Sequence, residues 1–122
     1  IKLMNKKGIL VKDANILLLG ITFKENCPDI RNTKIADIYT TLYEYSENIV
    51  VYDPWANPEQ VYNEYGITVV NALPQNELYN AVVLCVAHKE FINLDVRGLL
   101  NGSGVVYDVK GVLDREQIDG RL

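Results

Sequence analysis

The chain has 122 residues, of which 48% are hydrophobic and 23% are charged, a composition ordinary for one globular domain that can bury a core. Its net charge of -4 at pH 7 argues against a nucleic-acid-binding surface, because binding to a polyanion depends on clustered Lys and Arg. No apolar run approaches the roughly eighteen residues of a membrane helix. We expect a cytoplasmic protein.

The first fourteen residues predict the end of a preceding helix followed by a linker. Basic residues over 2–7 and then Gly8 are typical of a helix C-terminus. The chain also lacks an initiator Met. We therefore expect a fragment of a longer protein, with the folded domain over residues 15–122.

Strand and helix patterns alternate along that domain. Apolar runs predict strands over 15–20, 48–53, 67–70, 81–87 and 105–109. Apolar spacing, caps and prolines predict helices over 33–46, 58–64, 71–79 and 91–100, with Asn32 or Thr33 capping the first and a turn cluster over 101–104. This alternation predicts an α/β fold, a three-layer, Rossmann-like, doubly wound and mostly parallel sheet.

The loop after the first strand carries two cations, Lys24 and Arg31. Open parallel sheets bind ligands beyond the carboxyl ends of their strands, so this loop is a candidate site for an anion, with phosphate as the first choice. Lys110 follows the last strand in the same way. We expect the three cations to converge on a phosphorylated ligand, although pairing with Glu25 or Asp29 is the plainer interpretation of the loop.

Other chemistry is less well supported. A Rossmann dinucleotide site needs G-x-G-x-x-G after the first strand, and only Gly20 is present; Asp53 stands where a ribose-binding acid would, but is interpreted as a strand terminator. Cys27 has nearby cations but no evident base, and a lone His88 after a strand is more often a cap or core residue. With Cys85, these residues form no metal-ligand cluster, and two free thiols are expected.

Three motifs carry a resemblance to a known family. Residues 19–32 (LGITFKENCPDIRN), 51–55 (VYDPW) and 107–113 (YDVKGVL) resemble the C-terminal UDP-binding domain of the UDP-glucose/GDP-mannose dehydrogenase family. The first motif is most similar to the branch that oxidises UDP-N-acetylhexosamines, including the Vi-polysaccharide type. The resemblance covers nearly the whole chain.

The resemblance implies an NAD-dependent enzyme that oxidises the sugar C6 alcohol to a carboxylate for polysaccharide precursors, with NAD held mainly by an upstream domain and a helical dimerisation region between. It implies that Phe23 and Lys24 contact the nucleotide end of a UDP-sugar, that Arg31 reaches toward the NAD nicotinamide, and that Lys110 replaces a substrate-binding Arg. The full-length enzyme would be a homo-oligomer.

The family's catalytic cysteine lies in a Gly-x-Cys-x-x-Lys-Asp motif that is missing from this sequence. The resemblance therefore implies a domain that binds part of a substrate and catalyses nothing alone. The alternative from the residues is a stand-alone flavodoxin-like regulatory or interaction module without a nucleotide ligand.

Overall fold

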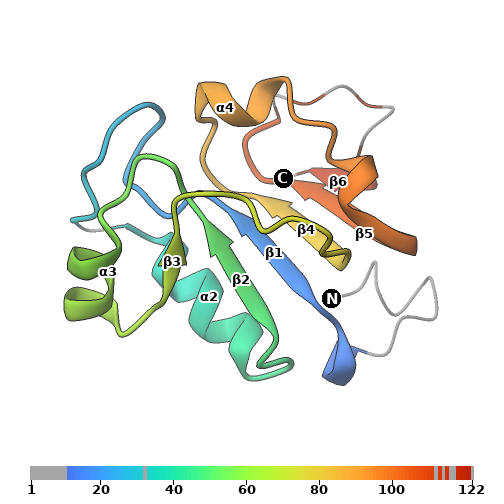
Figure 1. Ribbon diagram of the computed structural model, residues 1–122, viewed down its shortest axis with the longest axis horizontal. Coiled ribbons are helices and arrows are strands. Elements are labelled where there is room, and N and C mark those ends of the chain that lie inside the picture. Colours follow the sequence, from blue (N-terminus) through green and yellow to red (C-terminus); the bar gives the residue numbers. More distant parts are fainter. Residues whose placement is uncertain (1–10, 32, 112, 114, 116–117, 122) are drawn as a thin grey trace.

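The chain folds around one parallel sheet of six strands in the order β3-β2-β1-β4-β5-β6 (Figure 1). The computed structural model describes residues 11–31, 33–111, 113, 115 and 118–121. The strands are β1 (Ile16–Leu19), β2 (Ile49–Tyr52), β3 (Val69–Val70), β4 (Tyr79–Leu84), β5 (Leu100–Asp108) and β6 (Gly120–Arg121). All their pairings are parallel. The α/β class and the parallel sheet are confirmed.

The central strand is β1, which pairs with β2 on one side and β4 on the other. Its four residues are at most 1% exposed, because a strand covered on both faces has no polar face to alternate with. Ile16 and Leu18 point into one apolar cluster, and Leu17 and Leu19 point into the other. The continuous apolar run in the sequence thus indicated the strand's place correctly.

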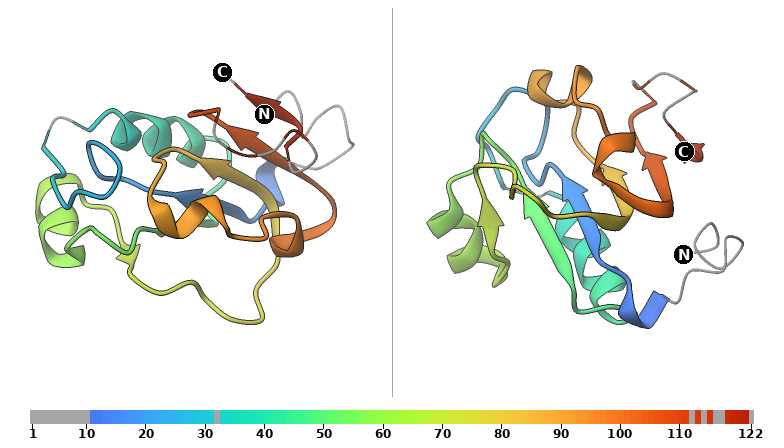
Figure 2. Two further views of the ribbon diagram at one scale, coloured as in Figure 1. Left: turned by 90° about the horizontal axis from the view of Figure 1, so that it is seen from above. Right: turned by 45° about the vertical axis from the view of Figure 1, so that its right-hand side comes forward.

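Helices cover both faces of the sheet and give it three layers (Figure 2). On one face lie α2 (Ile35–Tyr43) and α3 (Pro58–Tyr65), whose buried residues join Ile16 and Leu18. On the other lie α4 (Lys89–Ile92) and the short 3-10 helix η2 (Arg97–Leu99), with Phe91 in the second cluster. A further 3-10 turn, η1 (Val11–Asp13), precedes β1.

Local chemistry explains where the two long helices begin. The Asn57 side chain accepts hydrogen bonds from the N–H groups of Glu59 and Gln60, and Pro58 opens α3 where its missing N–H costs nothing. For α2, the cap expected at Thr33 is wrong by one residue, because the N-cap is Lys34, whose side chain makes no capping hydrogen bond. The Thr33 hydroxyl still accepts from the N–H of Ile35 at 3.2 Å. The alternative cap, Asn32, and the expected helix end over residues 1–8 lie outside the described residues.

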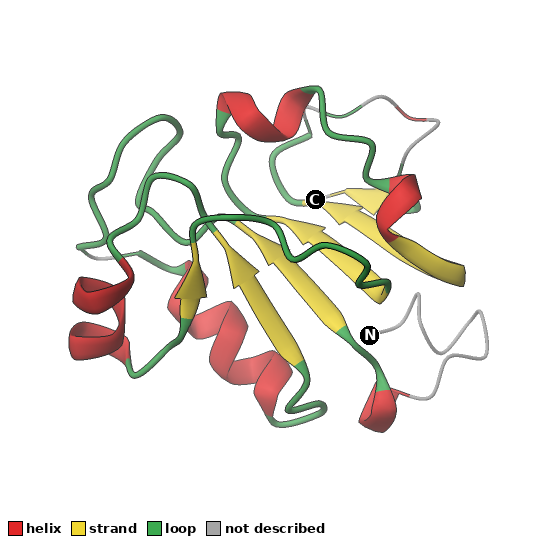
Figure 3. Cartoon of the chain, in the orientation of Figure 1, coloured by secondary structure: helices red, strands yellow, loops and turns green. Residues whose placement is uncertain are grey.

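The helix expected over 71–79 is wrong. This connection between β3 and β4 is an irregular loop (Figure 3). The Asn71 amide donates to the carbonyls of Asp53 and Ala56 at 2.8 and 2.7 Å, and Asn76 has a left-handed φ of 62°. The few residues between Pro74 and β4 could form only about one turn, which is marginal in water, so these anchors determine the shape.

Two other boundaries differ from expectation. The helical spacing over 91–100 is split between α4 and η2, with an irregular stretch between them. The expected turn over 101–104 lies inside β5 as a bulge, because the ladder passes from the pair Tyr79–Leu100 directly to Ala81–Val105. Extra residues in one strand of a ladder bend it without ending it.

The strand order separates the two fold hypotheses. It matches the dinucleotide-binding type, in which the chain changes direction between the first and fourth strands, and not the flavodoxin-like order. The flavodoxin-like shape in the alternative hypothesis is therefore wrong. No helix in the described part of the chain is long and apolar enough to cross a membrane.

Gly20 ends β1 at a point where a side chain does not fit. Its φ is +98°, and an added Cβ would lie 2.6 Å from the Cβ of Val86, in the segment that leaves β4. Gly66, which ends α3, has a similar φ of +71° but open space around it. A substitution at Gly66 therefore tests backbone strain alone, and a substitution at Gly20 tests strain together with crowding.

We expect Gly66→Ala to lower the free energy of unfolding by about 1 kcal/mol, the usual cost of a positive φ at a helix end. Gly20→Ala should lower it by roughly a further 1–3 kcal/mol, because the Val86 backbone and side chain must also move. Urea unfolding of both variants measures the difference. Equal losses would show that the contact between β1 and the β4 exit is loose.

Candidate functional site

The polar groups of interest gather at the edge of the sheet where its parallel strands end. The segments after β1, β2 and β4 meet there, and the turn after β5 lies at the same edge (Figure 1). Because neighbouring strands are about 4.8 Å apart, the ends of β1 and β5 are separated by about 10 Å with β4 between them. In folds of this order, ligands bind at this edge.

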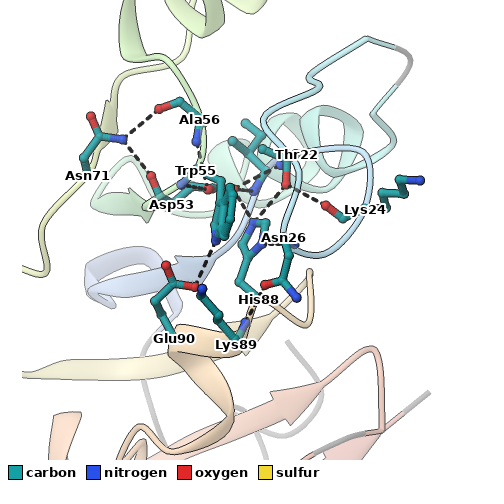
Figure 4. Close-up of polar contacts among 11 residues, drawn as sticks. Thr22, Lys24, Asn26, Asp53, Trp55, Ala56, Asn71, His88, Lys89 and Glu90 are labelled. Carbon is teal, nitrogen blue, oxygen red and sulfur yellow. Dashed lines mark hydrogen bonds and ion pairs between the residues drawn. The ribbon is translucent and has the colours of Figure 1, made fainter.

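A buried carboxylate organises the edge (Figure 4). Asp53 is fully buried. Its Oδ2 accepts hydrogen bonds from the backbone N–H groups of Ile21 and Thr22, at 2.8 and 3.1 Å. Its Oδ1 accepts from the N–H groups of Trp55 and Ala56 at 2.8 and 3.1 Å. One side chain thus fixes the exits of β1 and β2 together.

His88 links the same network to the exit of β4. It is fully buried, and its Nε2 lies 3.1 Å from Asp53 Oδ2 and 2.9 Å from Thr22 Oγ1. On the other side of the ring, Nδ1 accepts a hydrogen bond from the backbone N–H of Asn26 at 2.8 Å. The Asn26 side chain accepts in turn from the N–H of Lys89 at 2.8 Å.

Trp55 covers this network from outside. Its ring stacks on the His88 ring, with 6.1 Å between the two ring centres. Its Nε1 donates to Glu90 Oε1 at 2.9 Å, and the Lys89 ammonium lies 5.5 Å from its ring centre. Figure 4 shows Trp55 reaching from the β2 exit toward Glu90 and Lys89 of α4. An aromatic ring in this position shields the histidine and the carboxylate from water.

The surroundings of Asp53 favour its charged form. Burial opposes ionisation, but the hydrogen bonds from His88 and from backbone N–H groups outweigh it, so the pKa of the Asp53 carboxyl lies below its ordinary value of 3.8. A carboxyl with a lowered pKa in the folded state contributes stability above the unfolded pKa. That contribution is lost as the pH falls through the folded pKa.

We expect Asp53→Asn to lower the free energy of unfolding by about 3 kcal/mol at pH 7, because an amide NH2 would face backbone donors in a buried site. The loss should shrink as the pH falls below about 4, where the wild-type carboxylate is itself protonated. Urea unfolding between pH 2 and pH 7 measures both effects. A difference between the two proteins that is constant with pH would contradict the assignment.

Phe23 and Lys24 lie in the exposed middle of the loop after β1. Phe23 is 56% exposed although it is a large apolar residue, and Lys24 is exposed beside it. The loop turns back because the Phe23 N–H donates to the Asp29 carbonyl at 2.6 Å and the Thr22 hydroxyl donates to the Lys24 carbonyl at 3.2 Å. An exposed aromatic ring next to an exposed ammonium is suited to stack and to bind an anion.

Arg31 is held by Asp29 in a two-pronged ion pair. Its Nε and Nη2 donate to the two carboxylate oxygens at 3.0 and 3.1 Å, and the Arg31 side chain is 85% exposed. The pKa of Asp29 is lowered by these hydrogen bonds and that of Arg31 is raised by them. Of the two partners considered from the sequence, Glu25 and Asp29, the structure shows the ion pair with Asp29.

A groove of about 680 Å³ lies beside Arg31, and its lining residues are Ile30, Arg31, Gln60, Asn63 and Glu64. The groove is therefore formed by the loop after β1 and by α3. Lys24 and Lys110 do not line it. The structure thus places the three predicted cations at one edge of the sheet but does not bring them into one described pocket.

Lys110 is presented by a second buried carboxylate. Asp108, at the end of β5, is fully buried and accepts hydrogen bonds from the N–H groups of Lys110, Gly111 and Leu113 at 2.7–3.0 Å. This fixes a tight turn with Gly111 at a φ of +68°. The Lys110 side chain is left exposed, free to act on a ligand at the edge.

The same network shows why this chain does not form a Gly-rich dinucleotide site. Asp53 is where a ribose-binding acid would stand, but both of its oxygens are already taken by donors of the chain itself. A long loop, not a tight turn, joins β1 to α2. The interpretation of Asp53 as the residue that ends its strand is confirmed, with a larger structural role than expected.

In the described part of the chain, the thiols and possible metal ligands form no second site. Burial raises the pKa of the Cys85 thiol to about 12, so it stays protonated at neutral pH. Cys27 is partly exposed, and both cysteines are free. Among the described residues, no group of three or more His, Cys, Asp or Glu side chains could hold a metal ion.

We expect one thiol of the folded chain to react with a disulfide reagent at pH 8 and both to react in denaturant. Cys27 is accessible, whereas Cys85 is buried and protonated. A Cys27→Ser variant should remove the fast reaction and a Cys85→Ser variant should leave it. Two fast thiols in the folded wild type would disprove the burial of Cys85.

Sequence reasoning missed the network of Thr22, Asp53 and His88. His88 was correctly interpreted as a core residue or cap, since it is buried and precedes α4, but its partners were not foreseen. A signal was present: each of these polar residues stands at the end of a predicted apolar strand or shortly after it. Parallel strands bring such positions to the same edge of the sheet.

The strand order, the polar edge and the exposed cations define a Rossmann-type α/β domain that offers side chains, not a glycine-rich turn, to an anion. The chain belongs to the UDP-glucose/GDP-mannose dehydrogenase family. The family's UDP binding domain matches residues 17–115. The resemblance found in the motifs is thereby confirmed.

The curated relatives agree with the branch suggested by the first motif. Two proteins named UDP-N-acetyl-D-glucosamine 6-dehydrogenase, from Pseudomonas aeruginosa and Salmonella typhi, are each 46% identical to the chain over 125 aligned residues. Each match covers 100% of this chain and 29% of the relative. The chain therefore spans less than a third of the length of these relatives.

A solved structure shows the same fold. The NDP-N-acetyl-D-galactosaminuronic acid dehydrogenase from Methanosarcina mazei superimposes with a TM-score of 0.82 at 18% identity, over 98% of this chain and 26% of that one. At this identity the likeness supports the fold alone. It confirms the architecture without assigning a ligand.

Proposed function

We propose that this chain is the substrate-binding domain of an NAD-dependent UDP-sugar 6-dehydrogenase that acts on a UDP-N-acetylhexosamine. The observation that carries the proposal is the family's UDP binding domain, which matches residues 17–115. Within that range, the exposed Phe23, Lys24 and Lys110 lie at the ligand edge of the sheet. The two relatives at 46% identity support the N-acetylhexosamine class.

In this proposal, different exposed side chains bind different parts of the UDP moiety. Phe23 gives the base or ribose a flat apolar surface, while Lys24 and Lys110 give the diphosphate two point charges. An ammonium group supplies no bidentate fork, so Lys110 orients the diphosphate less strictly than an Arg would. Arg31, beside its own groove, is assigned to the side of the domain that faces the cofactor.

The reaction of the whole protein converts R–CH2OH, two NAD⁺ and one water into R–COO⁻, two NADH and three protons. When bound, each of the two NAD⁺ would accept one hydride, and the described residues of this chain do not fit a site for the pyrophosphate of NAD. We therefore assign NAD mainly to parts of the protein other than this chain. The chain's own residues bind and orient the nucleotide, and the attacking cysteine lies elsewhere in the protein.

We also infer that the whole protein is a cytoplasmic homo-oligomer that makes a precursor of a polysaccharide. The negative charge of the chain fits this proposal, because the anionic ligand is bound locally by a few cations instead of by a basic surface. No nucleic acid or membrane partner is assigned.

We expect Lys24→Ala and Lys110→Ala to raise the KM of the full-length enzyme for UDP-N-acetylglucosamine by about tenfold or more each, since each removes a charge-assisted contact to phosphate. Isothermal titration with UDP should show the same loss. Lys12→Ala is the matched control: Lys12 is an exposed lysine in η1, which precedes β1 and so lies at the opposite edge of the sheet. It should leave KM unchanged.

The outcome against the proposal is specific. If UDP binds equally well to wild type, Lys24→Ala and Lys110→Ala, the carboxyl edge of this sheet is not the nucleotide site. If Lys12→Ala weakens binding as much as the two site variants, the effect comes from net charge and not from contact.

A further inference from the structure

One imidazole ring holds both ends of the short segment that carries Phe23 and Lys24. His88 Nε2 contacts the Thr22 hydroxyl at 2.9 Å, and His88 Nδ1 accepts from the Asn26 N–H at 2.8 Å. Figure 4 shows the ring between these two points, with Lys24 projecting outward from the segment between them. We propose that His88 is a positioning residue that clamps segment 22–26 and thereby sets the affinity of Lys24 for the nucleotide.

The hydrogen bonds define which nitrogen carries the proton. A backbone N–H can only donate, so Nδ1 of His88 is unprotonated and accepts from Asn26. The ring proton therefore lies on Nε2, where it is shared between Thr22 Oγ1 and Asp53 Oδ2. The Thr22 hydroxyl keeps its own proton for the Lys24 carbonyl at 3.2 Å. Each donor in this chain of contacts has an acceptor.

Asp53 fixes the ring so that the ring can fix the segment. Its Oδ2 binds the N–H groups of Ile21 and Thr22 as well as His88 Nε2. The ring is packed against Phe91 at 5.4 Å and Trp55 at 6.1 Å. A buried ring held by a carboxylate and two aromatic neighbours cannot rotate freely, and its Nδ1 lone pair has one direction.

The other end of the clamp is an unusual backbone position. Asn26 has a φ of +54°, which costs energy for most residues and less for Asn. Its backbone N–H donates to His88 and its side chain accepts from the Lys89 N–H. Two hydrogen bonds to residues after β4 therefore hold this exposed residue in a left-handed conformation. They fix the position of the C-terminal end of segment 22–26.

The inference rests on the proposed function, because it concerns how Lys24 meets the UDP diphosphate. Lys24 itself has a flexible side chain, and the energy lost in ordering it falls if its backbone is already fixed. Breaking the clamp should weaken nucleotide binding without removing any group that contacts the nucleotide. It should leave the chemistry at the distant sugar carbon unchanged once substrate is bound.

Two substitutions divide the roles of the ring. In His88→Asn the side-chain oxygen takes the approximate place of Nδ1, so the acceptor for Asn26 remains; in His88→Gln the amide NH2 takes the approximate place of Nε2, so the donor to Asp53 remains. His88→Asn loses the Nε2 contacts to Thr22 and Asp53, His88→Gln loses the Nδ1 contact to Asn26, and both lose part of the ring packing. A role in stability alone therefore predicts that His88→Asn weakens binding at least as much as His88→Gln.

The experiment measures UDP affinity by isothermal titration, and KM and kcat with UDP-N-acetylglucosamine, in the full-length enzyme. We expect His88→Gln to weaken UDP binding and raise KM about tenfold, and His88→Asn to do so less than about threefold, with kcat within about twofold in both. Urea unfolding of both variants shows whether stability follows binding. Equal losses of affinity in the two variants would overturn the clamp.

A double-mutant cycle with Lys24→Ala tests whether His88 acts through Lys24. The variant with both Lys24→Ala and His88→Gln should bind UDP more tightly than the product of the two separate losses predicts, because part of the effect of His88 is exerted through Lys24. Losses that multiply would overturn the inference and leave the proposed site intact. If Lys24→Ala alone does not weaken UDP binding, both the proposed site and the clamp are wrong.

Asn26 offers the same test if the His88 variants do not fold. Asn26→Gly retains the positive φ but removes the acceptor for Lys89, whereas Asn26→Asp retains that acceptor and adds a charge that repels the diphosphate. We expect the Gly variant to weaken UDP binding severalfold relative to wild type at low and high salt, since one of the two bonds holding the segment is lost, whereas the loss in the Asp variant should disappear at high salt, where its charge is screened. Equal losses in the two variants at high salt would contradict the clamp.

Discussion

The structure depends on the buried carboxylate of Asp53. In place of water, it accepts hydrogen bonds from four backbone N–H groups and from an imidazole. These donors come from the exits of three parallel strands. Without an acceptor they would be buried and unsatisfied, which costs more than most single contacts contribute. One side chain thus lets three loops close together over an apolar sheet, with a polar interior shielded by Trp55.

The same solution is used twice at this edge. Asp108 at the end of β5 accepts from three N–H groups of the turn that carries Lys110. In both places a buried aspartate stands at the end of a strand and accepts hydrogen bonds from the loop that carries an exposed lysine, Lys24 in the first case and Lys110 in the second. The buried carboxylates make the loops rigid, and the exposed ammonium groups remain available to a ligand.

The sequence predicted the parts of the structure that depend on local patterns. The apolar run of β1 and the start of α3 at Pro58 were found because burial and a proline in a first helical turn leave clear marks in the local sequence. The loop at 71–78 was mistaken for a helix because Asn71 is anchored by carbonyls distant in sequence.

The partners of His88 were missed for the same reason, since Thr22 and Asp53 reach it only after three strands are aligned. The exposed positions of Lys24 and Lys110 could be foreseen from their place after strands, but the separate groove at Arg31 could not.

The long connection between β1 and α2 has a consequence for how an anion is held. Where a tight glycine turn leads into a helix, fixed amide dipoles surround the phosphate. Here the first residues past β1 are already engaged by Asp53, and exposed ammonium groups are what remains. Mobile ions screen such charges over about 8 Å at physiological ionic strength. Affinity at this edge should therefore fall with added salt, which makes the domain sensitive to its ionic surroundings in a way that a cradle of buried amides would not be.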